Sequence, residues 1–511
     1  MKITELNLTF IRGFVAQHSI QPSERINLFV GKNNAGKSTI LNSIYIIQNL
    51  NALTPSDISK DRHEGRIELH LDGIPEYIVK HGANVFSLND HNRVSFNFTQ
   101  TNIERVIHNA DGNGHGFGEA IREEPKNLIY PYLSRRKVGG YSETVNKQAT
   151  HSVMGNLTHL YAKIDRLSKP AEPAHEQYKK ACEEILGFLV TTVVSDQGQI
   201  AAYLIDTFQN IPLTSMGEGV PNLLGLIVDL CVAENKIFLI EEPENDIHPK
   251  ALKALLELIA KKSETNQFFI STHSNIVTKY LGSVEEAKVF RISMTFEEKL
   301  PHSKIEEVEN NEVARRELLE ELGYEFQDYD LHKAWLFLEE SSAEAVVRDF
   351  LIPNFAEGLL GKIKTFAANG KDKIKLKFDD FHHLFVFLNL QPIYKNRVWI
   401  IIDAGQSEKV ILDDLKDRYL KKGWQDDNFL QLSKHDFEEY YPKSFAEKVS
   451  ETLAIKDKGV QKEKKKELIE EVKQWWKENP DQAKTEFEES AAEIIQILKT
   501  IEKQLKASMA N

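Results

Sequence analysis

Short apolar runs alternate with helix-like segments along most of the chain, which predicts an α/β architecture with mostly parallel sheets. Near the N-terminus, apolar residues recur at close to every second position from Ile3 to Phe10, which indicates a first strand. Longer continuous apolar runs are typical of strands buried on both faces. Such runs lie within residues 26–30, 236–240, 267–274, 334–339 and 398–405.

Changes in polarity divide the chain into three predicted parts. An acidic, polar stretch from 297 to about 330 predicts a linker plus a helix, so a first domain spans 1–325 and a second spans 326–450. Within the first domain, an interrupted helical pattern at 156–188 predicts a short helical arm. From 451 to 511, Glu and Lys at helical spacing predict a charged, helical C-terminal extension.

A complete phosphate-loop motif, G-x4-G-K-[ST], lies between an apolar run and a helix-like segment. Its glycines let the backbone approach phosphates, so that N–H groups and the helix N-terminus face an anion. Lys37 would then reach the β- and γ-phosphates, and the Ser38 hydroxyl would bind Mg²⁺. The motif predicts an ATP site formed by Gly31, Asn33, Asn34, Gly36, Lys37, Ser38 and Thr39.

Two acids end the apolar run at 236–240, and they supply what a phosphate loop needs in order to hydrolyse ATP. The carboxyl end of a buried parallel strand lies at the same sheet edge as such a loop. We expect Glu241 to hold Mg²⁺, through water, and Glu242 to act as the general base.

Composition narrows the setting of this site. A net charge of −13 argues against nucleic-acid binding by bulk electrostatics, although a local basic patch could still bind DNA. No apolar run reaches the ~18 residues that a membrane span needs, and the N-terminus lacks the features of a signal peptide. Two cysteines exclude a disulfide framework, so we expect a cytoplasmic protein.

Two further segments sharpen the class of ATPase. Ser215-Met216-Gly217-Glu218-Gly219 lies about twenty residues before the acidic strand, and His273 lies about thirty residues after Glu242. With the phosphate loop and the acids, this order resembles the ABC-type ATPases, in the branch of SMC-like and recombination-factor proteins. One departure is Glu241, where that branch usually has Asp.

The resemblance to ABC ATPases implies that ATP lies between two subunits. Ser215, Gly217 and Gly219 would contact the γ-phosphate held by the other subunit, and His273 would sense it within its own subunit. The resemblance therefore implies a homodimer or higher homo-oligomer through the ATPase heads. The lack of a long apolar run predicts no membrane partner.

The second predicted domain carries acids at two strand ends. Glu339 follows the apolar run at 334–338, and Asp403 follows the run at 398–402. Acids at the carboxyl ends of neighbouring parallel strands converge on one edge, where they can bind a divalent metal for phosphoryl transfer. This order resembles a Toprim domain, in which Glu438 matches the late Glu and the acids would hold Mg²⁺ or Mn²⁺.

An ABC-type ATPase followed by a Toprim-like domain resembles the OLD (overcoming lysogenisation defect) family, which includes the Gabija ATPase–nuclease. The chain departs from that pattern twice: Glu340 replaces a glycine, and Gly405 replaces the second Asp of Asp-x-Asp. Glu344, Asp436 or Glu438 could compensate; otherwise the domain is a degenerate scaffold.

Two functions remain open from the sequence. The first is an anti-phage ATPase that controls its own Toprim-type DNA cleavage, with DNA as a partner. The second is a sensor and assembly ATPase with an inert Toprim-like domain, which regulates a separate nuclease or toxin, as in systems that resemble Septu. A DNA-repair ATPase is a third reading, which the short arm and the second domain disfavour.

Overall fold

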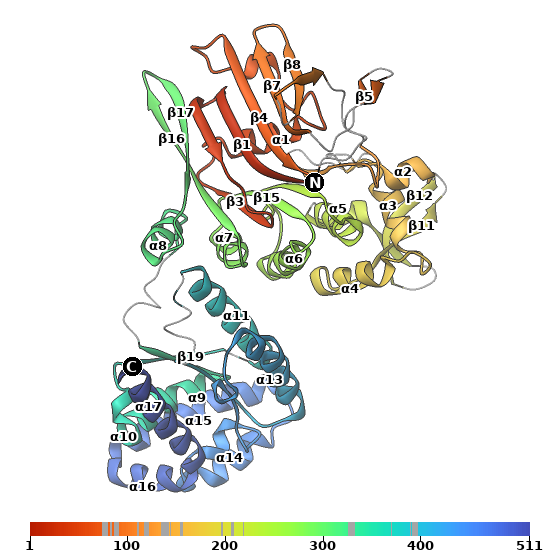
Figure 1. Ribbon diagram of the computed structural model, residues 1–511. Helices are drawn as coiled ribbons and strands as arrows, with labels where there is room; N and C mark the ends of the chain where they lie inside the picture. The colour runs from red at the N-terminus through yellow and green to blue at the C-terminus, as the bar shows by residue number, and fades with distance from the viewer. Residues whose placement is uncertain are drawn as a thin grey trace. The chain divides into compact units, whose positions relative to one another are not determined.

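The computed structural model describes residues 1–73, 80–81, 84–85, 91–109, 112–116, 122–133, 143, 145–153, 157–195, 198–205, 209–217, 219–324, 333–368, 370–388, 390 and 397–510. The chain forms two compact units, unit 1 (1–324) and unit 2 (325–511), and each is described by itself (Figure 1).

The central sheet of unit 1 has the strand order β10-β14-β15-β3-β16-β17. Neighbouring strands from β10 to β16 are parallel, and β16 and β17 form an antiparallel hairpin. The strands are β3 (Ile26–Val30), β10 (Ile129–Tyr132), β14 (Ile237–Glu241), β15 (Gln267–Thr272), β16 (Lys288–Glu297) and β17 (Leu300–Glu307). The helices α1 (Lys37–Tyr45), α5 (Gly219–Val232), α6 (Pro249–Lys262) and α7 (Asn275–Gly282) connect or follow them.

A second sheet in unit 1 is antiparallel, with the order β2-β1-β4-β7-β8-β9, so the prediction of mostly parallel sheets is wrong for this region. Strands such as β4 bury every second residue, because one face of an antiparallel sheet packs on a core while the other meets water. The strands are β1 (Lys2–Ile11), β2 (Phe14–Ile20), β4 (Glu64–Asp72), β7 (His91–Thr99), β8 (Ile103–Asn109) and β9 (Gly114–Gly116), beside a small β5 (Lys80–His81) and β6 (Asn84–Val85) pair.

One hydrophobic core joins this sheet to the phosphate-loop helix. It includes Leu6 and Leu8 of β1, Ile40 and Ile44 of α1, and Leu239 of β14. The antiparallel sheet therefore packs on the helix that begins at the phosphate loop and helps to fix its position (Figure 1).

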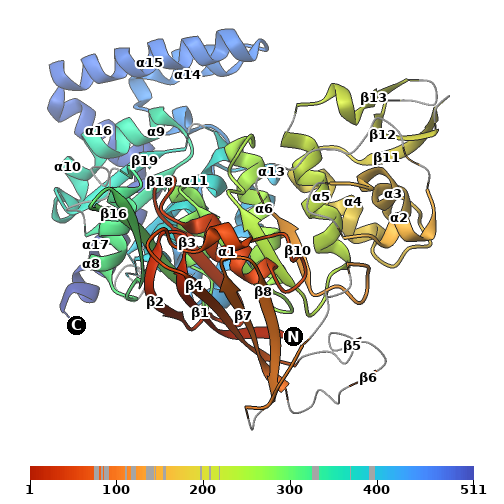
Figure 2. The same cartoon turned by 90° about the horizontal axis from the view of Figure 1, so that it is seen from above.

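The predicted arm contains two short helices, α3 (Leu160–Leu167) and α4 (His175–Ile185), after α2 (Lys147–His151). A three-stranded sheet follows them, formed by β11 (Val190–Ser195), β12 (Gly198–Leu204) and β13 (Asn210–Pro212). Figure 2 shows α3 and α4 beside α5, so the arm packs against the helix that follows the Ser215–Gly219 segment.

The stretch from 297 to about 330, predicted as a linker plus a helix, contains a strand in addition to a helix. It contains β17 and the helix α8 (Glu312–Glu321), both in unit 1. The strand was missed because most residues of β17 are only partly buried, and its sequence is correspondingly polar.

Unit 2 has a fully parallel sheet with the order β19-β18-β20-β21. Its strands are β18 (Ala334–Leu338), β19 (Ile363–Ala367), β20 (Val398–Ile402) and β21 (Phe429–Gln431). Strand order reverses between β18 and β20, and ligands of open α/β sheets bind at the carboxyl ends of the strands at such a point. The helices are α9 (Ser341–Val346), continued by a π-helix (Val347–Leu351) and α10 (Ile352–Phe355), then α11 (Lys371–Phe387), α13 (Gln406–Tyr419) and α14 (Ala446–Leu453).

The last sixty residues form helices that pack into unit 2 and do not form a separate extension. The helices are α15 (Lys458–Glu478), α16 (Pro480–Ser490) and α17 (Ala492–Ala510). Val472, Phe487 and Leu498 from these helices share one buried core with Leu336 of β18 and Trp399 of β20. Their apolar stripe completes the core of unit 2.

Candidate functional site

The phosphate loop leaves the sheet after β3 and enters α1 at Lys37. Gly36 caps this helix with φ +112°, a left-handed conformation that favours glycine. Gly31 packs so closely on the carbonyl of Ile292 that a Cβ there would clash. Asn33 and Asn34 are exposed, with Asn34 at φ +64°. The loop is therefore tightly turned, with its polar side chains in solvent.

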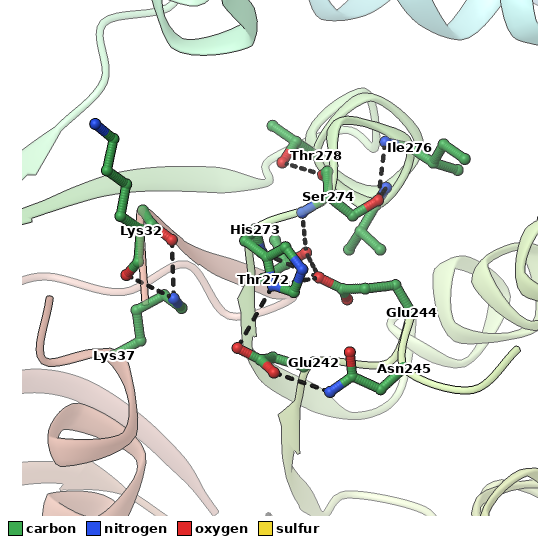
Figure 3. A network of polar contacts seen from close by, with 12 residues as sticks. Lys32, Lys37, Glu242, Glu244, Asn245, Thr272, His273, Ser274, Ile276 and Thr278 are labelled. Atoms are coloured by element: carbon green, nitrogen blue, oxygen red, sulfur yellow. Dashed lines mark hydrogen bonds and ion pairs between the residues drawn. The ribbon is translucent and has the colours of Figure 1, made fainter. Parts of the chain in front are cut away.

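Lys37 curls back over this loop. Its Nζ donates to the carbonyl oxygens of Gly31 at 2.8 Å and Lys32 at 3.0 Å (Figure 3). Burial lowers the pKa of Lys37, whereas the carboxylates of Glu242 and Glu244 act in the opposite direction. The ammonium is thus held at the loop by backbone oxygens, with carboxylates nearby.

Ser38 and Glu241 are brought together from 203 positions apart. The Ser38 Oγ donates a hydrogen bond to Oε1 of Glu241, which is 7% exposed at the end of β14. A hydroxyl and a carboxylate are oxygen ligands that Mg²⁺ prefers. The two residues predicted to bind Mg²⁺ therefore lie side by side and fit that ion.

Glu242 and His273 form a second polar group beside the loop (Figure 3). The backbone N–H of Glu242 donates to the carbonyl of Ser271 at 2.9 Å, and its φ of +47° turns the chain out of β14. His273 Nδ1 lies 3.5 Å from Oε1 of Glu242 and 3.4 Å from Oε1 of Glu244. The geometry unites the predicted base with the predicted γ-phosphate sensor.

Glu244 is a residue that sequence reasoning gave no role. Its Oε1 accepts hydrogen bonds from Thr272 Oγ1 at 2.6 Å and from the His273 backbone N–H at 3.0 Å. It thus fixes the turn that carries His273. Its position two residues after Glu242 was the sequence signal that could have identified it. In the structure, this position places Glu244 at the end of β15.

The Ser215–Gly219 segment lies at the start of α5, and Glu218 lies outside the described residues. Ser215 ends a 3₁₀ turn, and Gly219 is the first residue of α5. A Cβ on Gly219 would clash with the carbonyl of Asp246 in the loop after β14, whereas one on Gly217 would meet nothing within 4 Å. Gly219 is therefore required by packing within the chain, and Gly217 faces open space.

In unit 2, the predicted acids gather at the carboxyl ends of β18 and β20, where strand order reverses. The Asp403 backbone N–H donates to Oε2 of Glu339 at 3.3 Å. Burial, with the negative charges of Glu339, Glu340 and Glu438, raises the pKa of Asp403 to about 8. We call Glu339, Glu340, Asp403, Asp436 and Glu438 the acidic cluster.

A lysine from the C-terminal helices enters this cluster. Lys465 Nζ of α15 lies 2.6 Å from Oδ1 of Asp436, 2.8 Å from Oε2 of Glu438 and 3.8 Å from Oε2 of Glu340. Glu438 is fully buried, so the ammonium is its internal counter-charge. Sequence reasoning placed Lys465 only in the charged C-terminal extension, because nothing in the sequence placed α15 over the sheet.

Glu408 is a second residue that the sequence did not single out. Gly405, where the family pattern has its second Asp, has φ +147°, and a Cβ there would clash with the carboxylate of Glu408 from α13. An acid thus lies at this edge, supplied by another position. Within the described residues, however, no group of three or more His, Cys, Asp or Glu side chains is arranged to hold a metal ion.

Comparison with known families supports the reading of unit 1. The family model described as "AAA domain, putative AbiEii toxin, Type IV TA system" matches residues 163–278. That segment includes Ser215, Glu241, Glu242 and His273. The chain therefore contains an ATPase-type domain of the AAA/ABC-like class, which implies ATP and Mg²⁺ as its ligands.

Matches to whole proteins are weaker. Among curated proteins, no sequence matches the chain. An SMC head bound to the C-winged helix domain of ScpA is 14% identical, with TM-score 0.40, over 60% of this chain and 98% of its own. The SMC head domain from Thermotoga maritima is 14% identical, with TM-score 0.34, over 60% and 100%. A Pyrococcus furiosus Smc head bound to the C-terminal domain of ScpA is 14% identical, with TM-score 0.38, over 63% of this chain and 100% of its own. Similarity at this level assigns no function or partner.

In the described part of the chain, every helix is too short or too polar to cross a membrane.

Proposed function

We propose that this protein is an ABC-type ATPase of a prokaryotic anti-phage defence system, and that its unit 1 controls cleavage of DNA by the acidic cluster of unit 2. The observation that carries the ATPase assignment is the hydrogen bond between Ser38 and Glu241. It joins the phosphate-loop helix to the acidic strand end, which is the arrangement that holds Mg²⁺ against the phosphates of a bound nucleotide.

The proposed hydrolysis divides roles among residues already close together. Lys37 binds the β- and γ-phosphates after leaving the carbonyls of Gly31 and Lys32. Glu242 accepts a proton from the attacking water, and His273 contacts the γ-phosphate. Ser38 and Glu241 would hold Mg²⁺, which would supply positive charge next to the phosphate oxygens.

We further propose that each ATP lies between two copies of unit 1, with Ser215 and Gly217 of one copy contacting the nucleotide of the other. The open space around Gly217 supports this role, because its lack of a side chain is not explained by packing within the chain. The arrangement is a two-fold dimer with two equivalent sites.

Mixing two inactive variants tests the shared site. Gly217→Ala is expected to fold normally, and both it and Lys37→Ala are expected to lose ATPase activity. In a mixture, half of the dimers carry one intact site out of two, so the rate should recover to about one quarter of wild type. A mixture as inactive as its components, with heterodimers confirmed by differential tags, would show that each site is complete within one chain.

For unit 2, we propose phosphodiester cleavage from the position of the acidic cluster at the reversal of strand order. The carboxylates are of the type that binds Mg²⁺ or Mn²⁺, but they do not surround one point, so the proposal rests on residue type and position. Plasmid nicking in Mn²⁺ is expected from the wild type and not from Asp403→Ala. Equal nicking by both would reject the proposal.

The second candidate is a sensor ATPase whose unit 2 is inert and regulates a separate nuclease or toxin. The pairing of Lys465 with Glu438 and Asp436 favours it, because the cluster is neutralised by the protein itself. The description of the matched family, a toxin of a type IV toxin–antitoxin system, is compatible with either candidate. Loss of protection when a neighbouring nuclease gene alone is deleted would favour this second candidate.

A further inference from the structure

Unit 2 contains a cavity of about 660 Å³ above the carboxyl ends of β18 and β19. One wall is the first turn of α9, with Glu340, Ser341 and Ser342, and the opposite wall is α15. This volume lies within the range of about 300–1,000 Å³ that is usual for ligand sites. The cavity thus adjoins the acidic cluster through Glu340.

The α15 wall is strongly cationic. Lysines three, four or seven positions apart lie on one face of a helix, and the lysines at 458, 462, 465, 466 and 473 follow this spacing. All five line the cavity, against two glutamates, Glu340 and Glu470. We call Lys458, Lys462, Lys466 and Lys473 the lysine row, since Lys465 is bound within the acidic cluster.

The charges of the lysine row are weakly compensated. Lys473 lies 2.8 Å from Glu470, and the exposed Lys466 lies 3.7 Å from the exposed Glu463. Lys458 and Lys462 form no ion pair in the part of the chain that the structure describes. Solvent-exposed pairs contribute little, so the row can attract an anion.

The length of the row indicates the kind of anion. From Lys458 to Lys473 the helix rises about 22 Å. Such a row matches the regularly spaced phosphates of a strand better than the single phosphate cluster of a nucleotide. Lysine stems, with Ala345 and Ile469, also give the cavity apolar surface against which bases can pack.

We propose that this cavity binds a single strand of nucleic acid, with its phosphates along the lysine row and its path leading to the acidic cluster. This inference rests on the proposed function of unit 2 and adds to it the residues that recognise the substrate backbone. Phosphate contacts of this kind position a strand without reading its sequence.

Charge reversal in the full-length protein tests the lysine row. The variant carries Lys458→Glu, Lys462→Glu and Lys466→Glu. The matched control carries Lys484→Glu, Lys499→Glu and Lys503→Glu, which are exposed lysines of α16 and α17 outside the cavity. Both sets change the charge equally, and tryptophan fluorescence verifies folding, because all five tryptophans lie in unit 2.

Binding is measured by fluorescence anisotropy with labelled oligo-dT and oligo-U of about 12 nucleotides and with a duplex of that length. EDTA and the absence of ATP separate binding from cleavage. We expect the cavity variant to bind the single strands at least about tenfold more weakly, with the salt slope reduced by about 2 for three lost contacts. The control variant should bind like the wild type.

Several outcomes would overturn the inference. One is an equal loss of affinity in the cavity variant and the control variant, and another is tighter binding to duplex than to single strands. A third is displacement of the bound strand by poly-glutamate as effectively as by DNA of equal charge. Preference between oligo-dT and oligo-U identifies the strand as DNA or RNA. If the lysine row binds strands but no cleavage occurs in Mn²⁺, the proposed cleavage fails and the binding site stands. If the wild type cleaves and the cavity variant binds normally, the proposed binding site fails and the proposed cleavage stands.

Discussion

Both units gather carboxylates at the carboxyl edge of a parallel sheet, but these carboxylates have different partners. In unit 1, Glu241 accepts a hydrogen bond from the neutral hydroxyl of Ser38. In unit 2, Glu438 and Asp436 are paired with the ammonium of Lys465. The strand-end carboxylate of unit 1 therefore has a neutral hydrogen-bond donor, whereas two carboxylates of the acidic cluster in unit 2 have a cationic one.

The acid in unit 1 is therefore available to a cationic ligand, whereas the acids in unit 2 already have a cation, the ammonium of Lys465. A carboxylate beside a hydroxyl can exchange that neutral donor for Mg²⁺ at modest cost. A buried carboxylate paired with a lysine stabilises the fold, and removing the lysine leaves an uncompensated charge. We expect substitution of Glu242 in unit 1 to change ATP hydrolysis, and substitution of Lys465 in unit 2 to change the stability of that unit.

The largest expected effect is on ATP hydrolysis. Glu242→Gln removes the proposed base and should lower kcat by about 10²–10⁴-fold, while ATP binding stays intact. Glu298→Gln, at an exposed turn of unit 1, is the control. Steady-state phosphate release and equilibrium binding of labelled ATP measure the two properties. A variant that hydrolyses ATP at the wild-type rate would remove Glu242 from the mechanism.

The next effect concerns Lys465. Lys465→Met should destabilise unit 2 by about 3–5 kcal/mol, because Glu438 is buried without a counter-charge. Lys464→Met, whose exposed side chain pairs with Glu467, should leave stability unchanged. Urea unfolding followed by tryptophan fluorescence reports unit 2 alone. Equal stability of both variants would show that the acidic cluster does not depend on the lysine.

For a change of one pH unit, the smallest of the three effects is the dependence of the stability of unit 2 on pH. Asp403 has a pKa of about 8 in the folded protein against an ordinary value of 3.8, so between these values the folded state keeps a proton that the unfolded state has lost. Stability of unit 2 should therefore fall as pH rises from about 4 to about 8, by up to about 1.4 kcal/mol per pH unit. Asp403→Asn should flatten this slope in EDTA, as followed by tryptophan fluorescence. A slope that the substitution leaves unchanged would assign the effect to other groups.

The sequence was most informative where local pattern and chemistry coincide. The phosphate loop and the run ending in Glu241 have fixed spacings and flanking apolar residues, so the strands, α1 and the expected neighbours could be predicted. The antiparallel sheet was missed because an alternating apolar pattern predicts a strand but does not indicate which distant strand it pairs with. In unit 2, the packing of α15 and α13 on the sheet places Lys465 and Glu408 beside the acids. Their roles could therefore not be predicted from sequence spacing.

Glu244 shows the same limit at short range. Its proximity to Glu242 was evident, but its hydrogen bond to the backbone of His273 joins two loops separated by α6. Sequence patterns identify which strand ends carry polar residues. The turn that brings one loop over another follows from tertiary packing.

The docking of α15, α16 and α17 into the core of unit 2 has a consequence for biosynthesis. Strands β18 to β21 leave the ribosome before these helices, and domains tend to fold in the order of synthesis. The hydrophobic core beside the sheet is therefore incomplete until Val472, Phe487 and Leu498 have emerged. Unit 1 can fold before this point, whereas the acidic cluster acquires its lysine only after α15 has emerged.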